Sequence, residues 1–526
     1  MQKTLKILIL VFICGTINAQ NRWVHTYLDD LDATRAAMIT TYDHGYLLSG
    51  RHRPNWPKYN YLIKTDINGE VLWNKTLGDG NNGILPWGLG MNREGSIYFS
   101  GSFGVVGAYK DPLILKLNAC GEKEWCRIFP TEGYHDYGFG LCIAPDDGVA
   151  FIMTMTSNIP GEDRICLSRF SANGDFLWKK CYNLNDTVAM GNEYAYEVIS
   201  TPDSGFLLTG LCQYSNPEDS LSYLCPYYIK ADYSGEMEWY TVAGFHPFDV
   251  PGEGLQTVLS PDSTCYYSAI RHNFWDPGNF NKSSPALLKM DLQGNIIDVY
   301  DIAPPNTLGT ISSLKFITNS TISATAVWGP WGGSGYDIDN YAVILDTLGN
   351  IIEQEVVIQS ISPMITEVTY DKKILEFVET ISEDGAFDVY LFKLNQQLQG
   401  DSVYTRWFNY DSLCPYQIVS DTIPIEGCGL IVGMEELYDG NNNKEPELLI
   451  YPNPAQAQFT IQCEAFNESP TKVEIFDLYG QSIKTLEIPK GQTETTVTTE
   501  GWQKGVYLIQ VWRSGSFIAS GKVVMW

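Results

Sequence analysis

The sequence predicts an all-β protein: a seven-bladed β-propeller followed by a small C-terminal immunoglobulin-like β-sandwich. Three observations lead to this prediction. A unit of 51 to 61 residues recurs along the chain, each copy is typical of short strands joined by tight Asp/Asn-Gly turns, and residues 447–526 follow a different alternating pattern. We expect a signal peptide over residues 1–19, the propeller over 20–405, an extended linker over 406–446 and the sandwich over 447–526.

Composition already limits the class of protein. The chain has 526 residues, 44% hydrophobic and 18% charged, which is enough apolar material for large cores. It has 62 acidic and 34 basic side chains, giving a net charge of −28. Because no basic stripe is present to neutralise phosphates, we do not expect nucleic acid as a partner.

The N-terminus is typical of a secretory signal. Lys3 and Lys6 precede an apolar run over residues 7–13, and Ala19 provides a small residue before a cleavage point at Gln20. The run is much shorter than the ~20 residues that span a bilayer. We therefore expect export and no transmembrane segment in the mature chain.

The repeat is clearest in its first two copies, where residues 61–73 return as residues 113–125. The turn glycines of the seven copies are Gly69, Gly121, Gly174, Gly235, Gly294, Gly349 and Gly400. Each copy is predicted to form four strands, and a Trp four residues after the glycine falls on the outer strand in four of them. Its simplest role is to wedge between adjacent blades.

Ring closure has two candidate strands. Residues 21–27, which contain Trp23, resemble an outer strand and precede the first full unit. Residues 400–404 compete for the same place. We favour the N-terminal segment, because it has the Trp and its pairing would remove an open sheet edge.

Loop lengths predict a ligand surface on one face. The second-to-third loops and the blade connections are long, and long loops on a rigid scaffold are common binding sites. The ligand-binding residues predicted from these segments are Trp56, Trp87, His135, Trp275, Trp328 and Trp331. The alternative is that these aromatic residues fold inward and cap the blades.

Removal of the signal leaves 11 of the 12 cysteines. Hairpin geometry favours three cross-strand pairs, Cys120–Cys126, Cys166–Cys181 and Cys212–Cys225. Cys414 and Cys428 could close a further short segment, and Cys142, Cys265 and Cys463 have no evident partner, so we expect them to be buried. The spacing of cysteines and histidines predicts no metal site.

Four segments of the last module have a recognisable order: residues 451–454 (Tyr-Pro-Asn-Pro), residues 473–480, residues 505–511 and the terminal Lys-Val-Val beginning at residue 522. Together they resemble the type A C-terminal sorting domain of the type IX secretion system of Bacteroidetes. The motif residues are Tyr451, Pro452, Asn453, Pro454, Asp477, Gly480, Gly505 and Tyr507. The resemblance implies recognition by the secretion machinery, followed by release or attachment at the cell surface.

Function is less well specified. We favour a binding or scaffold propeller for polysaccharide or protein ligands, since no catalytic motif is recognised. A glycoside hydrolase or polysaccharide lyase is the alternative. A glycosidase would need two carboxylates ~5–10 Å apart, and the candidate acids are Asp136, Glu193, Glu197 and Glu253.

A quinone-cofactor propeller is a third interpretation, because residues 66–73 are similar to the tryptophan-docking repeats of such proteins. Docking repeats keep the Trp in nearly all blades, whereas only four units keep it in this chain. We therefore expect no cofactor.

Overall fold

The structure is a computed structural model that describes residues 23–27, 33–52, 60–78, 82–105, 110–130, 136–155, 164–183, 190–215, 222–243, 252–276, 279–302, 307–330, 339–358, 364–381, 387–431, 437–439, 448–463, 466, 470–477, 482–513 and 516–525. The chain divides into two compact units, Met1–Tyr438 and Asp439–Trp526. The predicted signal peptide lies outside the described residues.

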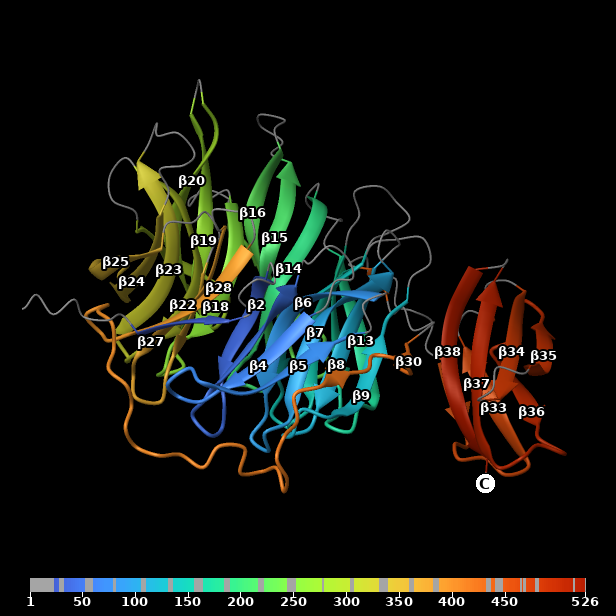
Figure 1. Cartoon of the computed structure of the whole chain (residues 1–526). Coiled ribbons are helices and arrows are strands. Elements are labelled where there is room, and N and C mark those ends of the chain that lie inside the picture. The colour runs from blue at the N-terminus through green and yellow to red at the C-terminus, as the bar shows by residue number, and fades with distance from the viewer. Residues whose placement is uncertain are drawn as a thin grey trace, which may run out of the picture. The chain divides into compact units, whose positions relative to one another are not determined.

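The first unit consists of sheets that follow one another along the chain (Figure 1). Blade 1 contains β2 (Ala33–Thr40), β3 (Tyr46–His52), β4 (Asn60–Thr65), β5 (Val71–Leu77) and β29 (Thr422–Ile423). Blade 2 contains β6 (Asn82–Met91), β7 (Ile97–Val105), β8 (Asp111–Leu117), β9 (Lys123–Ile128) and β30 (Gly429–Leu430). Blade 3 contains β10 (Tyr137–Ile143), β11 (Val149–Met155), β12 (Arg164–Phe170), β13 (Phe176–Asn183) and β31 (Leu437–Asp439).

The remaining blades have four strands each. Blade 4 contains β14 (Met190–Ser200), β15 (Phe206–Ser215), β16 (Ser222–Ala231) and β17 (Met237–Val242). Blade 5 contains β18 (Gly252–Leu259), β19 (Cys265–Asp276), β20 (Asn279–Asp291) and β21 (Ile296–Asp301). Blade 6 contains β22 (Thr307–Phe316), β23 (Thr321–Pro330), β24 (Asp339–Asp346) and β25 (Ile351–Ile358). Blade 7 contains β26 (Ile365–Val368), β27 (Ile374–Ile381), β28 (Phe387–Leu394) and β1 (Trp23–Tyr27).

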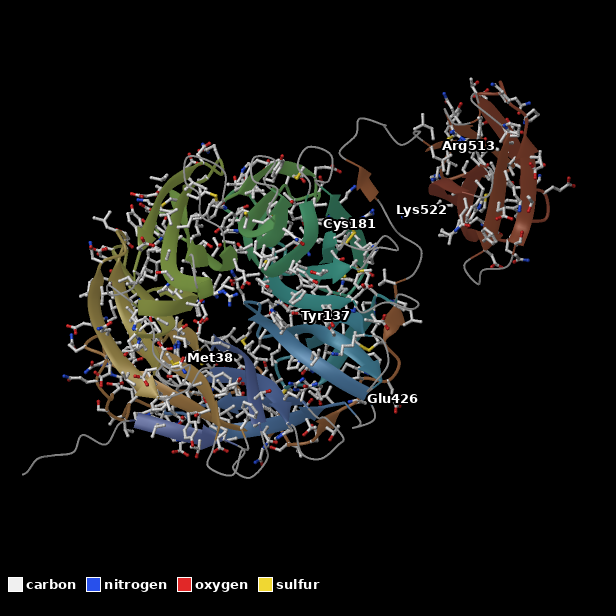
Figure 2. All side chains as sticks on the ribbon, turned by 90° about the horizontal axis from the view of Figure 1, so that it is seen from above. Met38, Tyr137, Cys181, Glu426, Arg513 and Lys522 are labelled. Atoms are coloured by element: carbon white, nitrogen blue, oxygen red, sulfur yellow. A yellow bond between two sulfur atoms is a disulfide. The ribbon has the colours of Figure 1, made fainter. Side chains whose placement is uncertain are left out.

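The seven sheets close into a ring. The first strand of each blade contacts the first strand of the next, from β2 through β26 and back to β2. Figure 2 shows the sheets of this unit arranged around a common centre. The fold is a β-propeller, as predicted.

The N-terminal strand closes the ring. Strand β1 pairs antiparallel with β28, with Trp23 opposite Lys393. The prediction that the Trp23 segment completes the seventh blade is confirmed. The competing Gly400 makes only an isolated bridge to Leu394.

Adjacent blades are joined by aromatic residues that dock on turn glycines. Gly69 has φ +82°, and a Cβ atom placed on it would lie 2.6 Å from the ring of Trp23 on the preceding outer strand. Gly174 repeats the arrangement with Trp125, also at 2.6 Å. The same docking joins Trp178 to Gly235 and Trp239 to Gly294. At Gly121 the close contact is the Lys75 side chain, with Trp73 at 3.4 Å, and at Gly349 it is the Cβ atom of Tyr300. The predicted Trp therefore packs against a turn position in the next blade that only glycine can occupy, because a Cβ atom there would clash with the ring.

In several blades a buried Lys or Arg side chain pairs with an Asp in the turn between the first and second strands. The ammonium of Lys64 lies 2.7 Å from Asp43, and both side chains are almost fully buried. Burial alone would raise the pKa of Asp43, but the charge and hydrogen bonds of Lys64 lower it below its usual value. Equivalent pairs are Arg169 with Asp146, Lys230 with Asp203 and Lys393 with Asp371.

Residues 401–431, which we call the strap, lie against blades 1 and 2 and also contact blade 7 through Asp401 and Phe408. Strand β29 pairs parallel with β5, and β30 pairs parallel with β9. Asp411 forms an ion pair with Lys64 at 3.3 Å. The described part of the predicted linker therefore has little regular structure but is bound to the propeller.

Two predicted disulfides are wrong. Cys120 bonds to Cys414 and Cys126 bonds to Cys428, instead of the local pairs Cys120–Cys126 and Cys414–Cys428. The reason is the path of the strap, which brings both of its cysteines onto blade 2. Cys126 also lies opposite Leu115 in the hairpin, out of register with Cys120 in the turn.

The other cysteines follow the hairpin register. Cys166 and Cys181 are cross-strand partners and form the predicted disulfide. Cys212 and Cys225 are also directly opposite but have free, buried thiols, so that predicted bond is not formed. Cys265 and Cys463 are buried, as expected, whereas Cys142 is only half-buried.

The second unit is a small β-sandwich. One sheet contains β32 (Leu448–Tyr451), β33 (Gln458–Cys463) and β36 (Glu494–Thr498). The other contains β35 (Ser482–Ile488), β34 (Thr471–Asp477), β37 (Gly505–Arg513) and β38 (Ser516–Met525). Alternate residues of both sheets, such as Phe459 and Ile509, share one core. The immunoglobulin-like strand order stays a prediction.

Candidate functional site on the propeller axis

The inner strands carry bulges at equivalent positions. Strands β2, β6, β10, β14, β18 and β22 each shift register against the next strand of the blade. A bulge leaves a residue unpaired and redirects its side chain. The residues skipped at these equivalent positions are Ala36, Trp87, Phe139 with Gly140, Tyr196, Leu255 and Ser312, and β14 has a second shift between Gly191 and Glu193.

Three of these positions form an aromatic row across successive blades. Trp87 of β6 meets Phe139 of β10 edge-to-face, with ring centres 4.8 Å apart. Phe139 meets Tyr196 of β14 in the same manner at 6.0 Å. Trp87 is 44% exposed although it lies on an inner strand, whereas Phe139 is buried behind it. The exposed indole therefore has a rigid support and a face available to a ligand.

A row of hydrogen-bonded polar groups continues around the inner strands of the next blades. It begins at Glu197, the residue after the Tyr196 bulge. Glu197 Oε1 accepts a hydrogen bond from Gln256 Nε2 of β18 at 3.2 Å. Gln256 Oε1 accepts from Ser313 Oγ at 2.9 Å and from the Leu314 amide at 2.6 Å, both on β22. Ser313 Oγ in turn accepts from the amide of Thr366 on β26 at 3.2 Å. One amide side chain thus joins three neighbouring blades, with Glu197 at the end of the row.

An ion pair lies beside this row. Lys315 Nζ of β22 is 2.7 Å from Glu367 Oε1 of β26. Burial raises the pKa of Glu197 to about 7, the charge of Glu367 adds to the rise, and the Gln256 hydrogen bond and the charge of Lys315 oppose it. Burial would lower the pKa of Lys315, but Glu367 and Glu197 raise it above its usual value. Glu197 can therefore gain or lose a proton near neutral pH.

A second ion pair extends the site on blade 5. Glu253 of β18 and Arg271 of β19 are opposite each other, with Arg271 Nη2 donating to Glu253 Oε1 at 2.9 Å. The charge of Glu253 also acts on Tyr196, whose pKa is raised mainly by burial. We define the axial patch as Trp87, Phe139, Tyr196, Glu197, Glu253, Gln256, Arg271, Lys315 and Glu367.

The axial patch contains one of the six predicted ligand-binding residues, Trp87. Trp56, His135 and Trp331 lie outside the described residues. Trp275 is within β19, but its side chain is not among those described. Trp328 is 3% exposed and packs on Tyr341, so it belongs to the core and is not carried into the site.

The four candidate acids separate into two groups. Glu197 and Glu253 belong to the axial patch, as described above. Asp136 and Glu193 are buried, at 0% and 3% exposure, and do not present an accessible carboxylate.

Sequence reasoning missed most of the patch. Tyr196 and Gln256 lie on the inner strands β14 and β18, but no sequence pattern marked them as functional. Aligning the inner strands of the repeats would place Trp87 with Tyr196, and Glu197 with Gln256, at matching positions. These matching positions are the sequence signal that identifies Tyr196 and Gln256.

The described residues show no group of three or more His, Cys, Asp or Glu side chains arranged to hold a metal ion. In the same part of the chain, no helix has the length and apolar character required to cross a membrane.

The sorting-domain motif residues are structural in the second unit. Asn453 Oδ1 accepts from the Val524 amide at 2.9 Å, and Asn453 Nδ2 donates to the Lys522 carbonyl at 2.8 Å. The flanking Tyr451–Pro452 and Asn453–Pro454 peptides are cis. The motif thus fastens the first strand of the unit to the last.

Two further motif residues, Asp477 and Tyr507, are cross-strand partners on the adjacent strands β34 and β37. Tyr507 is buried, lies opposite Asp477, and donates its hydroxyl to the Gln503 carbonyl at 2.8 Å. Gly505 begins β37, and Gly480 lies outside the described residues.

Comparisons with known proteins address the two units separately. No curated protein matches the chain in sequence. A solved structure of a polysaccharide lyase, the PL25 ulvan lyase, has a TM-score of 0.46 at 9% identity and covers 70% of this chain and 96% of its own. The periplasmic gluconolactonase PpgL of Pseudomonas aeruginosa has a TM-score of 0.40 at 10% identity, covering 73% and 96%.

An α-L-arabinanase of Penicillium chrysogenum has a TM-score of 0.37 at 10% identity, covering 59% of this chain and 93% of its own. Likenesses this remote say nothing about the activity of this chain.

The C-terminal unit has a family match. Residues 449–525 match the family model described as "Secretion system C-terminal sorting domain". This range coincides with the sandwich and with the motif that fastens its ends. The chain is therefore a β-propeller protein that carries a type IX secretion sorting domain at its C-terminal end.

Proposed function

We propose that the exported propeller binds a glycan chain at the axial patch. The observation that carries this proposal is the exposed indole of Trp87, which packs edge-to-face on Phe139. The hydrogen-bonded polar row lies on the inner strands of the following blades. A pyranose ring has an apolar face of C–H groups and an edge of hydroxyl groups. An aromatic platform beside a few fixed polar groups matches both features.

The polar row explains how such a ligand would be oriented. Gln256 is fixed by three hydrogen bonds, so its position costs little ordering entropy when a ligand arrives. Arg271 and Lys315 are each neutralised by a carboxylate, which favours a neutral or weakly charged glycan over a strongly anionic one.

The sorting domain supports a location for this activity. We infer that the secretion machinery recognises the second unit and that the propeller acts at the cell surface or in the medium. Cleavage before Gln20 stays a prediction, which the N-terminal sequence of the mature protein would test.

The experiment is a glycan panel probed with the full mature chain and with Trp87→Ala. The matched control is Trp407→Ala, because Trp407 is 82% exposed on the strap and is not part of the axial patch. We expect Trp87→Ala to lose binding and Trp407→Ala to retain it. Trp275→Ala tests the long-loop surface predicted from the sequence, and loss in that variant alone would move the site to the loops.

A second function is favoured by the position of Glu197 on the inner strand β14, where it accepts a hydrogen bond from Gln256 and where burial raises its pKa to about 7. A carboxyl group that titrates near neutral pH suits general acid or base catalysis, as in a glycoside hydrolase or polysaccharide lyase. Glu197→Gln would then abolish depolymerisation of a bound glycan while leaving binding nearly unchanged. Equal product formation by both proteins would exclude Glu197 as the acid or base.

A further inference from the structure

A pocket of about 440 Å³ lies at the opposite end of the inner strands from Glu253, between blades 1 and 7. Its lining residues are Thr40, Thr41, His44, Val368, Thr369, Tyr370 and Lys372. Thr40 ends β2 and Val368 ends β26, and these two inner strands are neighbours. The volume is within the ~300–1,000 Å³ range of small-molecule sites.

Two equivalent turns of the repeat form the walls. In the first, the His44 amide donates to the Thr41 carbonyl at 3.0 Å, and in the second the Lys372 amide donates to the Thr369 carbonyl at 3.0 Å. His44 and Lys372 occupy the same turn position, with φ of 68° and 58°. The turn geometry therefore presents two basic side chains across one pocket.

The acidic groups of these turns are already engaged. Thr41 donates to Asp43 at 2.6 Å, and Asp43 pairs with the buried Lys64. Thr369 donates to Asp371 at 2.5 Å, and the nearest cation to Asp371 is the buried Lys393, 3.4 Å away. The carboxylates thus satisfy cations inside the blades and are not available to a ligand.

The basic groups are not engaged in this way. Within the described residues, the Lys372 ammonium and the His44 imidazole have no hydrogen-bond or ion-pair partner. Lys372 offers three donors and no acceptor, and neutral or protonated imidazole offers at least one donor. Lys372 is exposed, so a ligand must replace the water on its ammonium with oxygen acceptors, and an anionic oxygen gives the stronger hydrogen bond.

An apolar surface adjoins these donors. The ring of Tyr370 is 62% exposed and stacks on His44 with ring centres 4.0 Å apart. His44 also contacts Phe408 of the strap at 4.7 Å, so its ring orientation is fixed from two sides. A ligand that reaches Lys372 can therefore pack a ring or chain against Tyr370.

We propose that this pocket binds a small organic oxyanion, a carboxylate or sulfate attached to a sugar-sized ring. The anion lies between Lys372 and His44, and the ring packs on Tyr370. The site is separate from the axial patch and does not depend on the function proposed for it.

The test uses the full chain, with ligand-observed NMR and calorimetric titration of glucuronate and glucose 6-sulfate. Glucose and inorganic sulfate are the comparison ligands, since each lacks one half of the proposed chemistry. We expect saturable binding of at least one acidic sugar, at least tenfold tighter than glucose and tighter than inorganic sulfate. Binding should also weaken as salt is raised.

Lys372→Asn removes the charge and keeps a residue that tolerates positive φ. We expect a loss of at least fivefold in affinity, and a similar loss for Tyr370→Ala. The backbone control is Ser204→Asn, at the same turn position in blade 4 with φ 70°. Trp87→Ala should leave this binding unchanged, which separates it from the axial patch.

Three results would overturn the proposal. They are equal affinity for glucose and the acidic sugars, unchanged affinity in both Lys372→Asn and Tyr370→Ala, and absence of saturable binding for every probe. Loss of acidic-sugar binding in Trp87→Ala would instead assign that binding to the axial patch, and would also refute a separate pocket.

Discussion

Replacing Glu197 by Gln should remove a pH-dependent component from the stability of the propeller. The side chain of Glu197 is half-buried on the inner strand β14, and burial raises its pKa from 4.5 to about 7. Gln keeps the size of the side chain and an oxygen that can accept the hydrogen bond from Gln256. The variant therefore removes titration with little change in packing.

The sign of the effect follows from the direction of the pKa change. Because the folded pKa lies above the unfolded value, the folded state binds the proton more tightly. The stability contributed by Glu197 is fully present below about pH 4.5 and is lost as pH rises towards 7. Each pKa unit corresponds to about 1.36 kcal/mol. The change from 4.5 to about 7 therefore limits the pH-dependent contribution of Glu197 to the free energy of unfolding to about 3 kcal/mol. Partial access of water to the side chain reduces this to roughly 2 kcal/mol.

Urea unfolding between pH 5 and pH 8 measures the effect. The stability of Glu197→Gln relative to wild type should rise by roughly 2 kcal/mol across this range. Glu500→Gln, at an exposed position in the C-terminal unit, is the control and should run parallel to wild type. Parallel curves for Glu197→Gln would show that the carboxyl is not in the environment described.

Two further predictions concern how the blades and the strap are held. Gly174→Ala should destabilise the propeller by about 2–4 kcal/mol, because the new Cβ meets Trp125 at 2.6 Å. The control is Gly427→Ala, because Gly427 has a similar positive φ but open space around it. Thermal unfolding should show a loss of only about 1 kcal/mol for this variant. Equal losses in the two variants would exclude the docking contact. Replacing Cys120 and Cys414 together by Ser should lower the free energy of unfolding by about 3 kcal/mol in chemical unfolding. The loss stays moderate because the Cys126–Cys428 disulfide still attaches the strap to blade 2. No change in stability would mean that the Cys120–Cys414 disulfide does not form.

Repetition made much of the fold predictable. Six of the seven predicted turn glycines mark the tight hairpin of their blade, and Asp66 shows why: its Oδ1 accepts the amides of Asn68 and Glu70 at 2.8 and 2.9 Å. The seventh, Gly400, was wrong, because Leu398 takes the positive-φ position of the equivalent turn in blade 7. The Trp on the outer strand of four units was readable for the same reason, whereas β25 of blade 6 has no aromatic residue. The orphan strand at Trp23 completed the blade that lacked one, as the repeat required.

Contacts between distant segments were not predictable from local spacing. Cys414 bonds to Cys120 across a sequence separation of 294 residues, and no pattern near either cysteine indicates the path of the strap. The pairing of Cys166 with Cys181 was predictable because both lie in one hairpin register.

The axial patch was predictable only in part. Trp87 and Glu197 were visible as residue types that suit a binding or acid–base site. The bulges that redirect Trp87 and Tyr196 depend on strand register, which the sequence does not display. The hydrogen bonds of Gln256 join three blades and therefore depend on closure of the ring.

The most direct test of the account is the affinity of the full chain for the glycan that scores highest on the panel, measured by calorimetry for wild type, Trp87→Ala and Trp407→Ala. The account predicts at least a tenfold loss for Trp87→Ala, with Trp407→Ala within a factor of two of wild type. Equal affinity of Trp87→Ala and wild type would contradict a glycan site on the propeller axis.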